Sequence, residues 1–186
     1  MAVEDGNAQQ EPAPSEQRPG MDDEGDLLEI SDTRTFLIFR DGSCLYALDA
    51  LCVQMLAEAQ QPVWVPSSNK QLLGVVHLHG QFIPMFNLPR VLGFEAEQFQ
   101  GPGEMLESRL IVLEIDGRRL AFNARTVLEL VEVSESAIQP MSGGLTDPSP
   151  LAERGLLAGY FEEAAGVVTV IDARKLLSAL KAGEAA

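Results

Sequence analysis

Two stretches of the chain share one pattern: FLIFRDGSCLYALD at residues 36–49 and IVLEIDGRRLAFNA at residues 111–124. Each stretch is an apolar run, an Asp-Gly pair and a second apolar run. An Asp-Gly pair between two apolar runs is a strong signal for a β-hairpin. The pairs Asp41-Gly42 and Asp116-Gly117 lie 75 residues apart. The pattern therefore predicts the same hairpin twice in one chain.

A second pair of stretches follows the first. LGVVHLHGQFIPMFNL at residues 73–88 is echoed by LLAGYF at 156–161 and GVVTVIDA at 166–173. In the earlier copy we expect a strand to His79, a turn at Gly80-Gln81 and a return strand from Phe82. A repeat of this length is too large for a solenoid unit. It indicates two similar β-subdomains.

The spacing of the strands defines the fold class. Strands of about five residues come in two sets with little helix between them, which favours small antiparallel barrels over βαβ units. We place the first subdomain at about 35–94 and the second at about 109–182. A closing helix from Asp172 or Ala173 to about Ala182 follows, with Asp172 as its N-cap. Its apolar face carries Leu176, Leu177 and Leu180.

The bulk composition excludes several kinds of partner. The chain has 186 residues, is 46% hydrophobic and carries a formal net charge of −15. Such a charge disfavours nucleic acid and anionic membrane surfaces, which need clustered Lys and Arg. No apolar stretch approaches the roughly 18 residues needed to span a bilayer, and no secretory signal is visible. We expect a soluble cytoplasmic protein without direct membrane insertion.

Residues 1–34 differ from the remainder. They contain ten acids and two bases, a net charge of −8, with three prolines and no aromatic residue. Such a segment cannot bury enough apolar area to offset its chain entropy, so it is interpreted as a disordered acidic tail. The tail is a solubilising arm, or else a partner-binding or autoinhibitory arm that competes for a basic surface.

Catalytic signatures are absent from the sequence. It contains no nucleotide-binding glycine motif and no nucleophile elbow, so neither an enzyme nor a bound cofactor is expected. One metal alternative involves Cys44, Cys52, His77 and His79 as a Cys₂His₂ zinc set. The two cysteines lack the short spacing of structural zinc sites, and both lie in apolar runs where buried free thiols are common. No metal site is therefore expected.

The stretch at residues 74–88 resembles the CheW-like domain of bacterial chemotaxis, whose pattern there is roughly Gly-Val-x-Asn-Leu-Arg-Gly-x-x-Ile-Pro-Val-x-Asp-Leu. The segments FLIF at 36–39, YALDALCVQ at 46–54, LAGY at 157–160 and VIDARKLL at 170–177 are similar to other parts of the family. The similarity spans about residues 35–180 in the right order. It implies two interlocked five-stranded, SH3-like β-barrels around a shared core.

The resemblance also implies a function. CheW-like domains couple methyl-accepting receptors to the histidine kinase CheA and are not enzymes. The residues that the resemblance places at a receptor or kinase contact are Val53, Met55, Leu78, His79 and Phe82. Leu78 and Phe82 could instead be core residues, because strand alternation does not say which face points inward.

Several positions depart from the family pattern. His79 replaces an arginine, so a permanent cation becomes a titratable group. Met55 stands where the family often has an acid. Asn87 replaces an aspartate, and in ARTV at 124–127 the acid of the family's Val-Asp-x-Val is replaced by Arg125. These changes alter charge while the apolar core positions are kept.

We therefore expect an adaptor in a chemosensory pathway, recruited to membrane receptor arrays, with a CheA-type kinase and a methyl-accepting receptor as partners. One alternative is a divergent paralogue that binds only one of these partners or a different one, for example in surface motility or a type IV pilus pathway. A small-ligand-sensing β-module is a further alternative, although no set of polar residues converges clearly enough to favour it.

Overall fold

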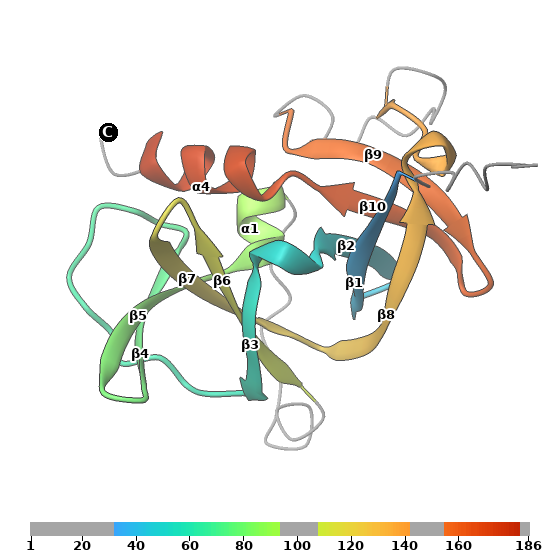
Figure 1. Cartoon of the computed structure of the whole chain (residues 1–186). Helices are drawn as coiled ribbons and strands as arrows, with labels where there is room; N and C mark the ends of the chain where they lie inside the picture. The colour runs from blue at the N-terminus through green and yellow to red at the C-terminus, as the bar shows by residue number, and fades with distance from the viewer. Residues whose placement is uncertain (1–31, 94–107, 142–154, 183–186) are drawn as a thin grey trace, which may run out of the picture. The chain divides into compact units, whose positions relative to one another are not determined.

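The computed structural model describes residues 32–93, 108–141 and 155–182, and strands dominate these parts (Figure 1). The first half of the chain holds β1 (Thr33–Asp41), β2 (Cys44–Asp49), η1 (Ala50–Cys52), β3 (Val53–Glu58), β4 (Leu72–Leu78), β5 (Gln81–Phe86) and α1 (Leu88–Leu92). The second half holds β6 (Arg109–Ile115), β7 (Arg118–Ala124), β8 (Thr126–Ser134), η2 (Glu135–Ala137), β9 (Leu157–Glu163), β10 (Gly166–Ile171) and α4 (Ala173–Ala182).

The strands form two five-stranded sheets. Sheet A has the order β8-β1-β2-β10-β9, and sheet B has the order β3-β6-β7-β5-β4. All neighbouring pairs are antiparallel except β2–β10 and β5–β7, which are parallel. The expected mainly-β fold of two interlocked five-stranded units is confirmed, and the arrangement is consistent with SH3-like barrels.

Each sheet combines strands from both halves of the chain. Sheet A joins β1 and β2 of the first half to β8, β9 and β10 of the second, whereas sheet B joins β6 and β7 to β3, β4 and β5. If each strand is replaced by its counterpart in the other half of the chain (β1 by β6, β2 by β7 and so on), one strand order becomes the other. The repeat read from the sequence is therefore real, but the expected division at about 94–109 does not separate the two sheets.

The two Asp-Gly pairs occupy different turn positions. Asp41 pairs with Cys44, so Gly42 and Ser43 are the central residues of the first turn, and only Gly42 has a positive φ (+60°). In the second hairpin Asp116 and Gly117 are themselves central, with φ of +50° and +72°. These angles correspond to types II′ and I′ respectively. The structural repeat is thus shifted by one residue relative to the sequence match.

Three apolar clusters hold the sheets together. One lies within sheet A around Phe36 and Phe161, and another within sheet B around Val112 and Met85. The largest is shared by both sheets and includes Phe39 of β1 and Phe122 of β7, whose ring centroids are 5.6 Å apart. Burying each such side chain stabilises the fold by about 1.5–3 kcal/mol. The shared cluster explains why the two sheets form one interlocked unit.

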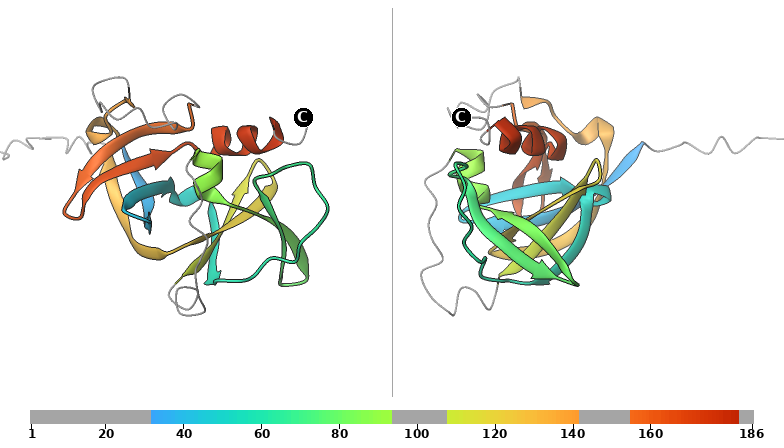
Figure 2. Two further views of the ribbon diagram at one scale, coloured as in Figure 1. Left: turned by 180° about the vertical axis from the view of Figure 1, so that it is seen from behind. Right: turned by 90° about the vertical axis from the view of Figure 1, so that its left-hand side faces the viewer.

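Two helices complete the shared core and lie side by side (Figures 1 and 2). The N-cap of α1 is Asn87, and Gly93 ends the helix in a left-handed conformation. The closing helix α4 begins after Asp172, whose Oδ1 accepts from the backbone N–H groups of the next turn. Its predicted apolar face is confirmed, because it is buried in the shared cluster: Leu176, Leu177 and Leu180.

Three local predictions are wrong. Thr33 and Arg34 were assigned to the tail but belong to β1, where they pair with Ser134 and Val133 of β8. Cys44 is exposed rather than buried, because it is the first residue after a turn. The turn between β4 and β5 is one residue earlier than expected, with Leu78 paired to Gln81 across it. The remaining residues of the predicted tail lie outside the described part, apart from Asp32.

Candidate partner-binding surfaces

The outer face of the β4–β5 hairpin carries an apolar patch, here called the hairpin patch. Two cross-strand pairs build it, His77 with Phe82 and Val75 with Pro84. Val63 extends it, because this residue forms a two-way backbone bridge with Val75. Phe82 is 75% exposed, and its ring lies 5.1 Å from the His77 ring. An exposed cluster of this kind suits protein binding.

The hairpin is short and well fixed. Alternation along β4 places Val76 and Leu78 inside the sheet B cluster, so His77 must face outward. His79 and Gly80 form the turn with φ of +47° and +80°. Two positive φ angles define a type I′ turn, which matches the twist of the flanking strands. The turn therefore holds His79 at the tip and Phe82 on the outer face.

The five predicted contact residues separate into two groups. Leu78 is only 8% exposed and belongs to the sheet B cluster, against which Met55 also packs. Val53 packs against the shared cluster. Burial leaves Leu78 little surface to offer a partner, and Met55 and Val53 are half-buried. His79 and Phe82, by contrast, are exposed at one hairpin.

A polar ladder crosses one end of sheet B. Arg119 of β7 donates to Gln81 of β5 and to Glu114 of β6, the latter at 2.8 Å. Gln54 of β3 donates to the same Glu114 oxygen at 2.8 Å. The ladder thus joins four neighbouring strands in the order β3-β6-β7-β5. It leaves this end of the sheet polar, in contrast to the hairpin patch beside it.

Exposed leucines also occur on one edge strand of each sheet. Leu56 lies on β3, and Leu128 and Leu130 lie on β8. Leu130 is 61% exposed although its cross-strand partner Leu37 is buried in the shared cluster. Sequence alternation could not single out these leucines, because a leucine in a strand is typical of the core. Leu128 and Leu130 form a second exposed apolar surface, on β8, that the sequence did not reveal.

The zinc alternative has no support in the geometry. Within the described ranges, no group of three or more His, Cys, Asp or Glu side chains is arranged to hold a metal ion. Burial is the main cause that raises the pKa of the Cys52 thiol, which favours its protonated form. Metal ligation requires the thiolate. Cys44 is exposed at the start of β2, whereas Cys52 lies in η1.

Two interlocked five-stranded sheets with exposed apolar patches are typical of a protein-binding β-module. Comparison with known protein families identifies the family. The model of the CheW-like domain family matches residues 35–181. The chain therefore belongs to the CheW-like domain family, whose members are adaptors and scaffolds of chemotaxis signal transduction. Among the described residues, no helix has the length and apolar character needed to cross a membrane.

A solved structure shows the same fold. The crystal structure of the scaffolding protein TtCheW from Thermoanaerobacter tengcongensis matches with a TM-score of 0.64 at 21% sequence identity. The match covers 77% of this chain and 86% of that protein. A search of curated proteins found no match. The structural likeness supports the fold, and the family model carries the assignment.

Proposed function

We propose that this protein is a non-catalytic adaptor that couples methyl-accepting receptors to a CheA-type histidine kinase at receptor arrays. The family assignment supplies the class, and the observation that carries the specific proposal is the hairpin patch. Phe82 exposes most of its ring while His77 packs against one side of it. A rigid aromatic side chain held in this way is typical of interface hot spots.

The two apolar surfaces suit an adaptor with two partners. The hairpin patch lies on β4 and β5, whereas Leu128 and Leu130 lie on β8 in the other sheet. An adaptor must hold two proteins at once, which requires two separate surfaces. We assign the hairpin patch to one partner and the leucines of β8 to the other.

Binding assays with the cognate kinase and with the cognate receptor test the proposal. We expect Phe82→Ala to weaken one of the two interactions at least tenfold, the loss typical of a hot-spot residue. Val167→Ala is the matched control, because Val167 pairs with Glu162 in sheet A as Phe82 pairs with His77 in sheet B. This control should leave both affinities unchanged.

Two further results would decide between coupling and the alternatives. His79→Glu should lower the affinity for the partner that binds the hairpin patch. It should not unfold the protein, since His79 is exposed at the turn. Binding of the wild-type protein to neither partner would overturn the coupling proposal. Binding to only one would support a divergent paralogue, and Leu130→Asp would then show whether the β8 surface is used at all.

A further inference from the structure

One stretch of the chain is almost free of charge. Between Glu58 and Arg90 the sequence holds a single Asp, Glu, Lys or Arg residue, Lys70, whereas 22% of the whole chain is charged. Strands β4 and β5 lie in this stretch. The hairpin patch therefore belongs to a nearly neutral part of a chain whose formal net charge is −15.

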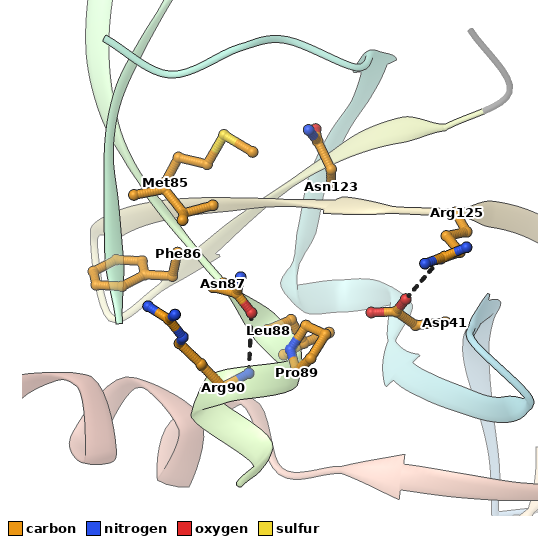
Figure 3. A pocket seen from close by; sticks show the side chains of 10 residues that line it. Asp41, Met85, Phe86, Asn87, Leu88, Pro89, Arg90, Asn123 and Arg125 are labelled. Atoms are coloured by element: carbon orange, nitrogen blue, oxygen red, sulfur yellow. Dashed lines mark hydrogen bonds and ion pairs between the residues drawn. The ribbon is translucent and has the colours of Figure 1, made fainter. Parts of the chain in front are cut away.

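The charged side chains around this stretch lie at the helix end of the hairpin, where β5 leads into α1. Arg90 lies there with Asp41 and Arg125, which form an ion pair at 3.7 Å (Figure 3). The Lys70 carbonyl accepts from Arg90 Nη1 at 3.3 Å at the same end. His77 is the sixth residue of β4, which places it roughly 17 Å along the strand from that end. Charge is thus gathered near α1 and away from the hairpin patch.

Trp64 extends the hairpin patch. It is the only tryptophan of the chain and is 73% exposed, next to the exposed Val63. Val63 donates to Val75 of β4 at 2.8 Å and accepts from it at 2.9 Å, and Gly74 leaves the space for this close approach. The two backbone hydrogen bonds fix the segment to the edge of the sheet, so Trp64 is held beside the patch.

Trp64 and the hairpin patch together fit an apolar partner surface without charge. Exposed Trp and Phe side chains are typical of the buried centre of interfaces, where charged residues are depleted. A charged group of a partner would lose its water here without gaining an opposite charge. A second copy of this chain is disfavoured, because each copy carries a net charge of −15. The surface, here called the neutral surface, consists of Val63, Trp64, Val75, His77, Phe82 and Pro84.

Histidine is the group that can charge this surface near neutral pH. Both histidines of the chain lie in the hairpin, His77 in the patch and His79 at the turn. The elements that pair with β4 are β5 and the segment 59–69, and neither contains a titratable residue. Arg119 of β7 reaches the hairpin near its turn and donates to Gln81. No acid of β4, β5 or this segment faces His77.

Protonation of His77 would place a charge within the neutral surface. The His77 ring lies 5.1 Å from the Phe82 ring, and both residues are exposed in the free protein. Water and the aromatic ring can therefore stabilise an imidazolium there. A partner that covers both rings removes the water, and no carboxylate of the surface replaces it. Binding consequently favours the neutral imidazole and weakens as the pH falls.

We propose that the neutral surface docks an apolar, uncharged surface of one partner, with Trp64 as an anchor, and that protonation of His77 releases that partner. The proposal rests on the coupling function proposed above, because it names the chemistry and the regulation of the hairpin patch. Strand β8 contains no histidine, so binding of the other partner to its leucines should not share this pH dependence.

Binding assays at about pH 7.5 and about pH 5.5 test the proposal, with the kinase or receptor whose binding Phe82→Ala weakens. We expect an affinity about tenfold lower at the acidic pH, because histidine changes its charge in this range. His77→Gln should remove most of the difference, since glutamine stays neutral. His79→Asn is the matched control, because asparagine tolerates the left-handed turn conformation, and it should keep most of the difference.

Trp64 provides a direct readout, because the chain has no other tryptophan. The full chain labelled with 5-fluorotryptophan should give one ¹⁹F signal that shifts when the partner binds and returns at about pH 5.5. Trp64→Ala should weaken binding at least tenfold, the loss typical of a hot-spot residue. Leu51→Ala removes an exposed apolar side chain outside the neutral surface and should leave the affinity unchanged.

A probe that needs no partner separates the surface from the coupling function. Nile red, an uncharged apolar dye, should bind the full-length wild-type protein more strongly than Trp64→Ala or Phe82→Ala, and this excess should shrink at about pH 5.5. If this dye result is obtained while neither the kinase nor the receptor binds, the coupling function is refuted but the neutral surface is supported.

Four results would overturn the proposal. Equal partner affinity of the wild type at both pH values is the first, and a pH dependence that His79→Asn removes but His77→Gln keeps is the second. Equal dye binding by the wild type and both variants is the third. The fourth is a concentration-dependent rise in mass of the protein alone that Trp64→Ala abolishes, because the surface would then bind a second copy.

Discussion

Asn87 and Asp172 occupy equivalent positions, and each caps the helix that follows its sheet. Asn87 Oδ1 accepts from the backbone N–H of Arg90 at 3.0 Å, and Asp172 Oδ1 accepts from that of Lys175 at 3.1 Å. The internal repeat thus extends beyond the strands to the capping hydrogen bonds. Both caps orient helices whose apolar side chains enter the shared cluster.

Removing the Asp172 cap should destabilise the protein. We expect Asp172→Ala to lower the free energy of unfolding by about 1 kcal/mol, because the first backbone N–H groups of α4 lose their acceptor. Asp172→Asn is the control and should cost little, since asparagine caps equally well and the ion pair with Lys175 is on the surface. Urea denaturation measures both, and equal losses would contradict the capping role.

Glycine is required at two equivalent positions where two backbone segments approach each other closely. A Cβ on Gly159 would lie 2.5 Å from the Gln139 carbonyl oxygen, and one on Gly74 would overlap the carbonyl oxygen of Val63. Each glycine precedes a residue that bridges to the neighbouring segment. We expect Gly159→Ala to cost about 2 kcal/mol or more, because backbone must shift to accept the methyl group.

Gly42→Ala provides the comparison for that substitution. Gly42 has open space around its Cβ position but a φ of +60°, so only the backbone conformation is penalised. The expected loss is about 1 kcal/mol. Thermal unfolding of the two variants should therefore rank them, and a smaller loss for Gly159→Ala would refute the steric explanation.

Truncation of Leu78 should destabilise the protein far more than truncation of Phe82. Leu78→Ala leaves a cavity in the sheet B cluster and should cost about 2–4 kcal/mol. Phe82→Ala removes an exposed ring and should change stability by about 0.5 kcal/mol or less. Calorimetric melting separates the two effects, and a strongly destabilised Phe82→Ala would place that ring in a structural role.

We expect the ionisation of Tyr46 to lower the stability of the protein at alkaline pH. Burial raises the pKa of Tyr46, and nearby Cys44 and Asp41 raise it further. The unfolded state ionises near pH 10 while the native phenol keeps its proton, so the native state binds more protons there. Stability is fully present below about pH 10 and falls as the pH rises further.

The variant Tyr46→Phe tests that dependence. It should flatten the decline in the free energy of unfolding above about pH 10, because the titrating group is gone. Unfolding experiments at a series of alkaline pH values in both proteins provide the comparison. Parallel declines in the two proteins would show that another group dominates.

The start of β1 can be located by truncation. Deleting residues 1–34 removes the pairings of Thr33 and Arg34 with β8, and also the ion pair of Arg34 with Asp49 at 2.5 Å. We expect a melting temperature several degrees lower than for deletion of residues 1–31, since about 1 kcal/mol shifts the midpoint of a domain this size by 2–4 °C. Identical midpoints would mean that β1 effectively begins at Thr35.

The candidate site was only partly predictable. Phe82 and His79 could be selected because they lie in the motif-bearing hairpin, but the same reasoning also selected Leu78, which is buried. Strand alternation defines two faces without saying which one is buried. The exposure of the β8 leucines could not be foreseen, because local alternation does not show which strand faces the fold leaves uncovered.

The sequence by itself determined the two Asp-Gly hairpins, the Asp172 cap and the repeat, because these depend on neighbouring residues: turn glycines, capping side chains and local alternation. Only the tertiary structure decided which strands share a sheet. The parallel pairs β2–β10 and β5–β7 join segments far apart in the chain, and their stability comes from packing the shared cluster. The doubled pattern thus specified two similar halves, whereas burial of one common core decided that the halves exchange strands.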